Sequence, residues 1–338
     1  MSRALAALLA ALALAGCGKP TEVREPDLVI RDAAAAVAPA PAEGVDTPET
    51  SRTVRIAVVS HGQASDGFWA IVRNGIEAAQ RQMGVSVTYR APDVYSVPRM
   101  RSLIDEAVAS RPDGLVVSIP SPAVAPSIRR AVREGIPVVS INSGSDVSRR
   151  LGILTHVGQP EARAGFAAGE RLATAGVRDA LCINHEAGNV SLETRCRAFA
   201  RALREFGGRS QVLAVDFQDA DAAQQAVESA VRRGGVDGVL TLNSAGAEAA
   251  LRAVQGTNTF VGTFDLSPAV LDAVRTGRIL FAIDQQPYLQ GYLPVVLLTQ
   301  FKRFGLFPAQ GDVVASGPNF VTRENAAQAV RLSKQGIR

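Results

Sequence analysis

Two polar side chains, Asn142 and Asp265, each follow a short apolar run that is typical of a buried strand. An Asp-Gly pair starts the same pattern in both halves of the sequence: Asp113 stands 29 residues before Asn142, and Asp237 stands 28 residues before Asp265. A repeat of this kind predicts two structurally similar lobes. Ligands of open parallel sheets bind just beyond the carboxyl ends of the strands. We therefore expect both polar positions to lie at a ligand site.

The chain has few residues suited to catalysis. His61, His156 and His185 are its only histidines, so general acid–base chemistry has few candidates. His61 follows an apolar run, but a single His in that place is more often a hydrogen-bonding or packing residue. The sequence contains no glycine-rich nucleotide motif, no nucleophile elbow and no Cys or His pair at zinc-binding spacing. We therefore expect a binding protein with no metal and no cofactor.

Strand-like and helix-like patterns alternate from residue 53 onward. Residues 54–60 form a short apolar run, apolar residues then recur at helical spacing over 68–83, and period-two alternation follows over 85–89. Further buried-type strands are expected over 115–119 and 137–141. Such alternation predicts parallel sheets with helices on both faces, so the expected fold class is α/β with two doubly wound lobes.

The amino-terminal segment predicts export. Arg3 precedes an Ala- and Leu-rich run over 5–14, which is too short to span a bilayer and fits the apolar core of a secretion signal. The sequence Leu-Ala-Gly before Cys17 resembles the lipobox of bacterial lipoproteins, which implies removal of residues 1–16 and lipidation of Cys17. The alternative is an ordinary signal peptide with a chance Cys. Residues 17–52 are rich in Pro, Ala, Glu and Asp, so we expect a disordered tether.

Charge and cysteine content limit the partners. The formal net charge is +4, and the basic residues are scattered along the chain, whereas nucleic-acid binding needs a basic patch or stripe. No nucleic-acid partner is therefore expected. In an exported chain Cys182 and Cys196 are candidates for a disulfide, but two buried free thiols fit the sequence equally well.

Short segments along residues 53–325 together resemble a known family. They are Ile56-Ala57-Val58-Val59, Gly67-Phe68-Trp69, Pro112-Asp113-Gly114, Gly135-Ile136-Pro137-Val138-Val139, Phe264-Asp265 and Ile283-Asp284-Gln285-Gln286-Pro287. In this order and spacing they resemble the type I periplasmic sugar-binding proteins of ABC transporters, which include ribose and galactose binders. The lac-repressor family shares this core but begins with a DNA-binding helix-turn-helix, whereas this chain begins with an export signal.

The resemblance implies two lobes joined by a hinge that the chain crosses three times. The implied crossings fall near residues 157–160, 284–287 and 312–316. The implied lobes are a first of residues 53–158 plus 287–312 and a second of residues 159–286 plus 313–338. In such a fold the lobes close on a ligand by a hinge motion.

The ligand-binding positions of the family can be carried onto this sequence residue by residue. They are Asp66, Phe68, Trp69, Ser118, Ser121, Asn142, Gln159, Arg195, Asn243, Asp265 and Gln285. Asp265 is the strongest candidate, because a carboxylate can accept hydrogen bonds from two neighbouring hydroxyls. Arg195 would bind two ligand oxygens with its planar guanidinium, or else lie on the surface. Phe68 and Trp69 would cover the apolar face of a sugar, or else pack in the core.

Two departures from the family leave the ligand open. Asn142-Ser143 stands where the family often has Asp-Arg, and His185 and Glu186 stand where many relatives have small or apolar residues. The resemblance therefore implies a small neutral hydroxylated ligand, either a sugar or a polyol, without singling out ribose or galactose.

The implied function is that of a monomeric receptor that delivers its ligand to an ABC permease. Its expected location is the periplasm, at a membrane face, where the lipid on Cys17 holds it. A sensory protein that presents the ligand to a membrane receptor or kinase is the first alternative. An exported enzyme on the same fold is the second, and the missing nucleophile and metal motifs argue against it.

Overall fold

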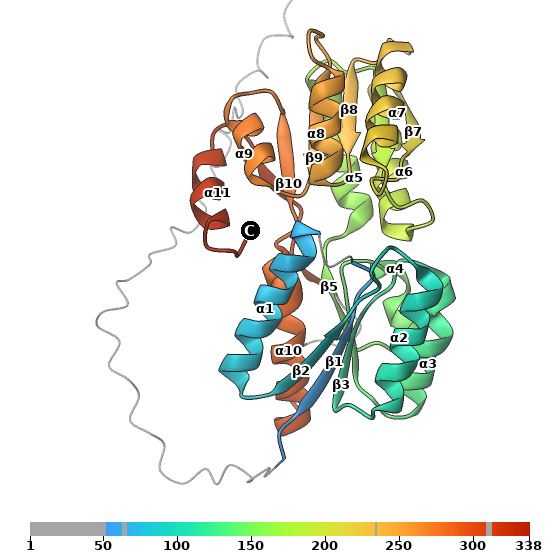
Figure 1. Ribbon diagram of the computed structural model, residues 1–338, viewed down its shortest axis with the longest axis vertical. Helices are drawn as coiled ribbons and strands as arrows, with labels where there is room; N and C mark the ends of the chain where they lie inside the picture. The colour runs from blue at the N-terminus through green and yellow to red at the C-terminus, as the bar shows by residue number, and fades with distance from the viewer. Residues whose placement is uncertain (1–51, 63–65, 234, 309–312) are drawn as a thin grey trace, which may run out of the picture. The chain divides into compact units, whose positions relative to one another are not determined.

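The computed structural model describes residues 52–62, 66–233, 235–308 and 313–338, and its strands form two sheets (Figure 1). The first sheet has the order β11-β5-β4-β3-β1-β2 and consists of β1 (Arg55–Val59), β2 (Ser86–Arg90), β3 (Gly114–Ser118), β4 (Val138–Ile141), β5 (Thr155–Gly158) and β11 (Val313–Ala315). The second has the order β12-β10-β9-β8-β6-β7 and consists of β6 (Asp179–Asn184), β7 (Arg209–Ala214), β8 (Gly238–Thr241), β9 (Phe260–Phe264), β10 (Phe281–Asp284) and β12 (Asn319–Val321).

The two sheets share one topology. The order β2-β1-β3-β4-β5 in the first sheet matches β7-β6-β8-β9-β10 in the second. A strand from near the end of the chain completes each sheet at the equivalent edge, β11 beside β5 and β12 beside β10. All paired strands are parallel except β12, which runs antiparallel to β10. The expected α/β fold with two similar, doubly wound lobes is confirmed.

Helices cover both faces of each sheet. Those of the first lobe are α1 (Gly67–Met83), α2 (Val97–Ala109), α3 (Ala125–Arg133), α4 (Ser145–Ser148) and α10 (Pro287–Phe304), with the short 3₁₀ helices η2 (Pro122–Val124) and η3 (Arg149–Leu151). Those of the second lobe are α5 (Glu161–Thr174), α6 (Val190–Glu205), α7 (Ala220–Arg233), α8 (Ser244–Ala253), α9 (Pro268–Arg275) and α11 (Ala326–Ser333).

The pattern of β1 explains why its sheet needs helices on both faces. Ala57 and Val59 pack in one core with α2 and α3, whereas Ile56 and Val58 pack in a second core with α1 and α10. Successive side chains of a strand point to opposite faces. A strand that is apolar at every position is therefore stable only when both faces are covered.

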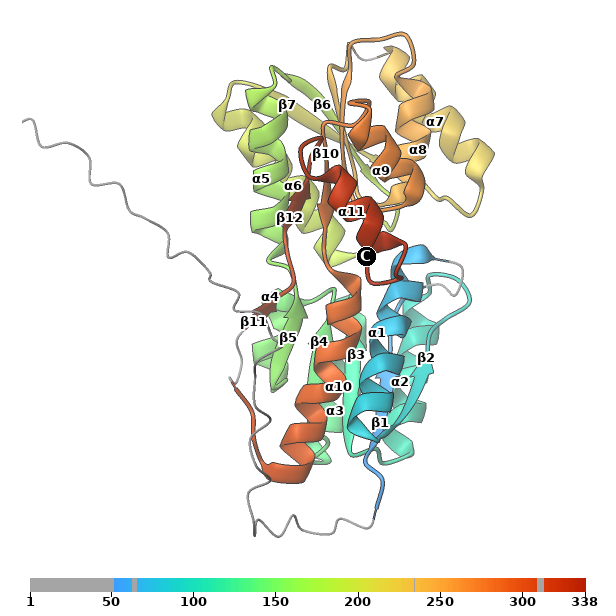
Figure 2. The same cartoon turned by 90° about the vertical axis from the view of Figure 1, so that its left-hand side faces the viewer.

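Helices α1 and α10 lie side by side, although the second lobe separates them in the sequence (Figure 2). Two glycines permit the close approach. A Cβ at Gly75 would lie 2.1 Å from the backbone oxygen of Tyr288, and one at Gly291 would lie 2.0 Å from that of Val72. The helix α10 thus returns the chain to the first lobe after its passage through the second.

Three short segments connect the lobes: residues 159–160 between β5 and α5, 285–286 between β10 and α10, and 316–318 between β11 and β12. The third connection begins at residue 316, so the expected boundary between the lobes, after residue 312, is wrong. Val313–Ala315 pairs in parallel with β5 and extends the first sheet, so these three residues do not belong to the second lobe.

The second lobe contains a disulfide between Cys182 of β6 and Cys196 of α6. Of the two alternatives for these residues, the structure has the bridge. In the described part of the chain, no helix has both the length and the apolar character needed to cross a membrane. Cys17, the predicted signal and all but the last residue of the predicted tether lie outside the described residues.

Candidate functional site

Asn142 and Asp265 occupy equivalent places in the two lobes, directly after β4 and β9. Both adopt a left-handed backbone, with φ of 60° and 67°. The N–H of Asn142 donates to the carbonyl of Val157 on β5 at 3.2 Å, and that of Asp265 donates to Ile283 on β10 at 2.9 Å. Asn and Asp tolerate this conformation better than most residues. The backbone therefore explains part of the choice of residue at both positions, before any ligand is considered.

A cavity of about 680 Å³ lies between the strand ends of the two lobes. The first lobe contributes Asp66, Gly67 and Tyr95 to its wall. The second lobe contributes, among others, His185, Glu186, Asp216, Phe217, Asn243, Glu248 and Asp265. The predicted residues Asp66, Asn243 and Asp265 therefore meet at one cavity, although they come from both lobes.

Asp66 and Asn243 are held in place by the helices that they begin. Asp66 accepts a hydrogen bond from the N–H of Phe68 at 2.8 Å at the start of α1, and Asn243 accepts one from Gly246 at 2.8 Å at the start of α8. Such caps satisfy N–H groups that have no partner inside the helix. Burial raises the pKa of Asp66. Both side chains thus enter the cavity wall in a fixed orientation.

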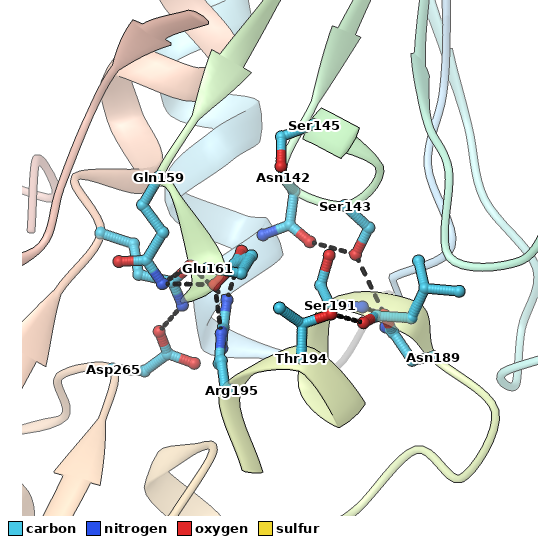
Figure 3. Close-up of polar contacts among 12 residues, drawn as sticks. Asn142, Ser143, Ser145, Gln159, Glu161, Asn189, Ser191, Thr194, Arg195 and Asp265 are labelled. Atoms are coloured by element: carbon cyan, nitrogen blue, oxygen red, sulfur yellow. Dashed lines mark hydrogen bonds and ion pairs between the residues drawn. The ribbon is translucent and has the colours of Figure 1, made fainter. Parts of the chain in front are cut away.

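Arg195 lies at the centre of a buried polar network (Figure 3). It is only 2% exposed, and its guanidinium donates to the two carboxylate oxygens of Glu161 at 2.5 and 2.9 Å. It also donates to Oε1 of Gln285 at 2.8 Å. Gln159 donates to Glu161 at 3.0 Å and to Gln285 at 3.2 Å. Arg195 is therefore not a surface residue, and its planar fork holds a carboxylate of the protein.

Asp265 connects this network to the cavity. The side-chain amide of Gln285 donates to Oδ1 of Asp265, which lines the cavity wall. Burial raises the pKa of Asp265 to about 7, against the opposing effects of Arg195 and Gln285. Of the charged network around Arg195, Asp265 is thus the member that reaches the cavity.

A second network joins the lobes around Asn189, at the start of α6 (Figure 3). The hydroxyl of Ser143 lies 3.2 Å from Oδ1 of Asn189 and 3.2 Å from Oδ1 of Asn142. The amide of Asn142 donates to Gln290 of α10 at 3.4 Å. The predicted residue Asn142 is therefore engaged by neutral partners of the protein itself.

His61 extends these contacts between the lobes. Its Nδ1 lies 2.8 Å from the hydroxyl of Ser118, and its Nε2 lies 3.5 Å from the amide of Asn189 and 3.6 Å from a carboxylate oxygen of Glu186. Burial lowers the pKa of His61 to about 3, which leaves the ring neutral. As the sequence indicated, His61 is a hydrogen-bonding residue, here with a partner in each lobe.

The remaining predicted positions do not belong to the described lining of the cavity. Trp69 is 3% exposed in the core with α1 and α10, and its ring meets those of His61 and Phe68 edge-on at 5.0 and 5.3 Å. Ser121 accepts from the N–H of Ala123 at 3.3 Å. The described lining of the cavity does not include Phe68, Trp69, Ser118, Ser121, Asn142, Gln159, Arg195 or Gln285. Direct contact of these residues with a ligand stays a prediction.

The sequence did not indicate several residues of the site, among them Tyr95, Phe217 and Glu161. Tyr95 and Phe217 line the cavity and follow β2 and β7. The rule that polar or aromatic residues beyond strand ends meet the ligand would have found both, had it been applied to the edge strands. Glu161 is different, because its role depends on Arg195, 34 residues away. No local pattern signals such a pair.

Comparisons with known proteins agree on one family. The model of the periplasmic binding protein domain matches residues 56–304. A carbohydrate transporter from Acidothermus cellulolyticus 11B, solved in complex with myo-inositol, is 34% identical with a TM-score of 0.79, over 85% of this chain and 100% of that one. The xylose/arabinose-binding protein XylF of Sulfolobus acidocaldarius is 26% identical over 299 residues, which are 81% of this chain and 72% of that protein. A periplasmic sugar-binding protein from Legionella pneumophila, 24% identical with a TM-score of 0.72 over 78% of this chain and 99% of that one, shows the shared fold.

Proposed function

The chain belongs to the periplasmic binding protein family. From this membership we propose that it is a receptor that closes on a small neutral sugar or polyol and delivers it to an ABC import permease. From the lipobox-like sequence before Cys17 we propose that a lipid anchors it to the membrane. One observation carries the proposal: a single cavity takes its wall from both lobes, with Asp66 on one side and Asn243 and Asp265 on the other. A ligand that contacts both walls stabilises the closed arrangement over the open one.

The connections between the lobes support a hinge motion. Within the described residues, three short segments cross, at 159–160, 285–286 and 316–318. The lobes also touch directly, since the N–H of Val190 on α6 donates to the carbonyl of Pro120 at 2.9 Å. Bonds of this kind break when the lobes separate and form again on closure, as expected of a fold that opens and closes around its ligand.

The chemistry of the cavity wall supports a hydroxylated ligand. Carboxylates accept hydrogen bonds from the hydroxyls of a ligand, and amides both accept and donate them. Tyr95 and Phe217 supply aromatic surface. The relative from Acidothermus cellulolyticus was solved with myo-inositol, a ring of hydroxyls without charge. We infer the same class for this chain, with pentoses, hexoses and cyclic polyols as the compounds to test.

Thermal unfolding of the purified protein against monosaccharides and polyols tests the binding function. A ligand present at a hundredfold its Kd should stabilise the protein by about 2.7 kcal/mol, which raises Tm clearly. Asp265→Asn should abolish that rise. Asp272→Asn, an exposed carboxylate on α9 paired with Arg275, should preserve it. The absence of any shift across the whole panel would contradict the proposal.

Delivery and anchoring need separate tests. Cells that lack the gene should lose uptake of the compound that raises Tm, and the gene with Cys17→Ser should move the protein from the membrane fraction to the soluble fraction. Uptake that persists in the deleted strain, with loss of a response to the same compound, would instead favour a sensory role.

A further inference from the structure

Acidic side chains line the cavity from both lobes. They are Asp66 of the first lobe and Glu186, Asp216, Glu248 and Asp265 of the second. Among the described residues of the lining, none is Lys or Arg. Burial lowers the pKa of His185 in the same wall to about 3, so its ring is neutral. The described wall thus offers a ligand five carboxyl groups and no positively charged group.

Cations behind the wall balance only part of this charge. Arg195 makes two hydrogen bonds to Glu161, so that pair is neutral as a whole. In the first lobe, burial raises the pKa of Asp66, and the charge of Arg73 offsets part of that rise. The excess of negative charge therefore falls on the second-lobe side of the cavity, where Glu186 and Asp265 lie.

Glu186 and Asp265 lie in surroundings that disfavour their ionised forms. Burial raises the pKa of each to about 7, and the charge of Asp66 across the cavity adds to the effect on both. A carboxylate in this position is stabilised when an opposite charge comes within a few ångströms. The strongest stabilisation comes from a partner that also donates hydrogen bonds.

The arrangement suits an organic cation and not a metal ion. Across the part of the chain that the structure describes, no group of three Asp, Glu, His or Cys side chains is placed to hold a metal. The carboxylates are instead spread over the walls of a cavity of about 680 Å³. A ring that bears hydroxyls and one ammonium group can fill such a space and meet carboxylates on separate walls.

We propose that the cavity prefers sugars or cyclic polyols in which one hydroxyl is replaced by a protonated amine over the corresponding neutral parents. This inference rests on the proposed function and narrows its ligand. The ammonium donates up to three hydrogen bonds, and Glu186 and Asp265 are the acceptors that it meets on the second lobe. The same negative charge disfavours uronates, which carry a carboxylate on a similar ring.

Isothermal titration calorimetry of the purified protein with matched compounds tests this preference. The pairs are glucose and glucosamine, galactose and galactosamine, and myo-inositol and its monoamino derivatives, at a pH where the amine is protonated. In the pair that the cavity accepts, the amine should bind at least about tenfold more tightly than its parent. The N-acetyl derivative, which has no charge, should lose that advantage, and the uronate should bind more weakly than the neutral sugar.

Two isosteric variants locate the effect. Glu186→Gln should reduce the ratio of amine affinity to parent affinity severalfold, while a single cooperative unfolding transition without ligand shows that the fold is intact. Glu205→Gln changes an exposed carboxylate at the far end of α6 and should leave the ratio unchanged. Equal affinities for amine and parent, unaltered by Glu186→Gln, would overturn the inference and leave the proposed function standing. If no member of any pair binds, the inference is overturned, and the proposed function falls with it only when the thermal panel, pentoses included, also yields no ligand.

Discussion

The strand ends of the two lobes share a backbone but differ in chemistry. Asn142 and Asp265 have the same left-handed conformation and donate to equivalent strands. In the first lobe, Asn142 and Ser143 are neutral and hydrogen bond to each other. In the second, Arg195 and Asp265 belong to a charged network. One scaffold thus places neutral contacts at the strand end of the first lobe and a charged network at that of the second. Four of the five acidic residues in the described lining of the cavity also belong to the second lobe, so this lobe contributes most to the preference for ligand charge.

A second difference concerns how the helix that follows the first strand of each lobe is attached to that strand. In the second lobe a disulfide joins β6 to α6. In the first lobe the equivalent pair, β1 and α1, is held by apolar packing through residues such as Val58 and Val72. At this strand and helix the second lobe therefore has a covalent link, whereas the first lobe relies on packing. Each prediction below tests one part of this contrast.

The largest effect is expected from breaking the buried ion pair of the second lobe. Glu161→Ala leaves the guanidinium of Arg195, which is 2% exposed, without its carboxylate. Removal of one partner of a buried pair costs about 3–5 kcal/mol of stability, because the remaining charge is not compensated. Chemical denaturation of the ligand-free protein measures this loss.

A matched change in the first lobe sharpens the result. Ser143→Ala removes neutral hydrogen bonds to Asn142 and Asn189, and a neutral bond contributes only about 1 kcal/mol. The exposed Glu205→Ala on α6 should change the free energy of unfolding by less than about 0.5 kcal/mol. Equal losses for Glu161→Ala and Ser143→Ala would contradict the view that charge is what distinguishes the second lobe.

Loss of the disulfide should have the next largest effect. Cys182 and Cys196 are 14 residues apart, and closure of a loop of that length in the unfolded chain contributes about 3 kcal/mol. The double variant Cys182→Ala, Cys196→Ala should therefore unfold at lower denaturant than the oxidised protein. A reductant should lower the midpoint of the natural protein and leave that of the variant unchanged. A reductant with no effect on either would show that the bridge adds nothing.

The fold could be predicted from the sequence because its signals are local and repeated. Apolar runs such as residues 54–60 and 137–141 mark strands, and the spacing of Asp113 and Asp237 from the polar positions marks the repeat. The sequence did not reveal that residues 313–315 belong to the first lobe, because β11 has three residues and its partner β5 is far away in the sequence. Short edge strands depend on pairing that no local pattern encodes.

The site could be predicted in part. Positions in the segments that follow strands, such as Asp66, Asn243 and Asp265, follow from the topology of the sheet. Whether a side chain faces the cavity or packs behind it depends on long-range contacts. Trp69 and Arg195 both carry the right chemistry for a sugar site, yet one is buried in a core and the other is paired with Glu161.

The last prediction is a pH dependence that differs between the lobes. In the second lobe, burial raises the pKa of Glu186 and of Asp265 to about 7, from ordinary values of 4.5 and 3.8. The folded state then binds protons more tightly than the unfolded state, so this contribution to stability is present below about pH 4 and is lost as the pH rises through about 7. The Tm of the ligand-free protein should therefore fall as the pH rises from about 4 to about 7, and Glu186→Gln and Asp265→Asn should each flatten the fall.

The pKa of Asp113 in the first lobe is shifted in the opposite direction. Burial opposes the shift, but the N–H of Arg55 and the charges of Lys302 and Arg52 lower the pKa of this carboxyl. Its contribution is lost only as the pH falls through the lowered pKa, so Asp113→Asn should leave the slope between pH 4 and 7 intact. A slope that responds to Asp113→Asn and not to the second-lobe variants would reverse the assignment of charge to the lobes.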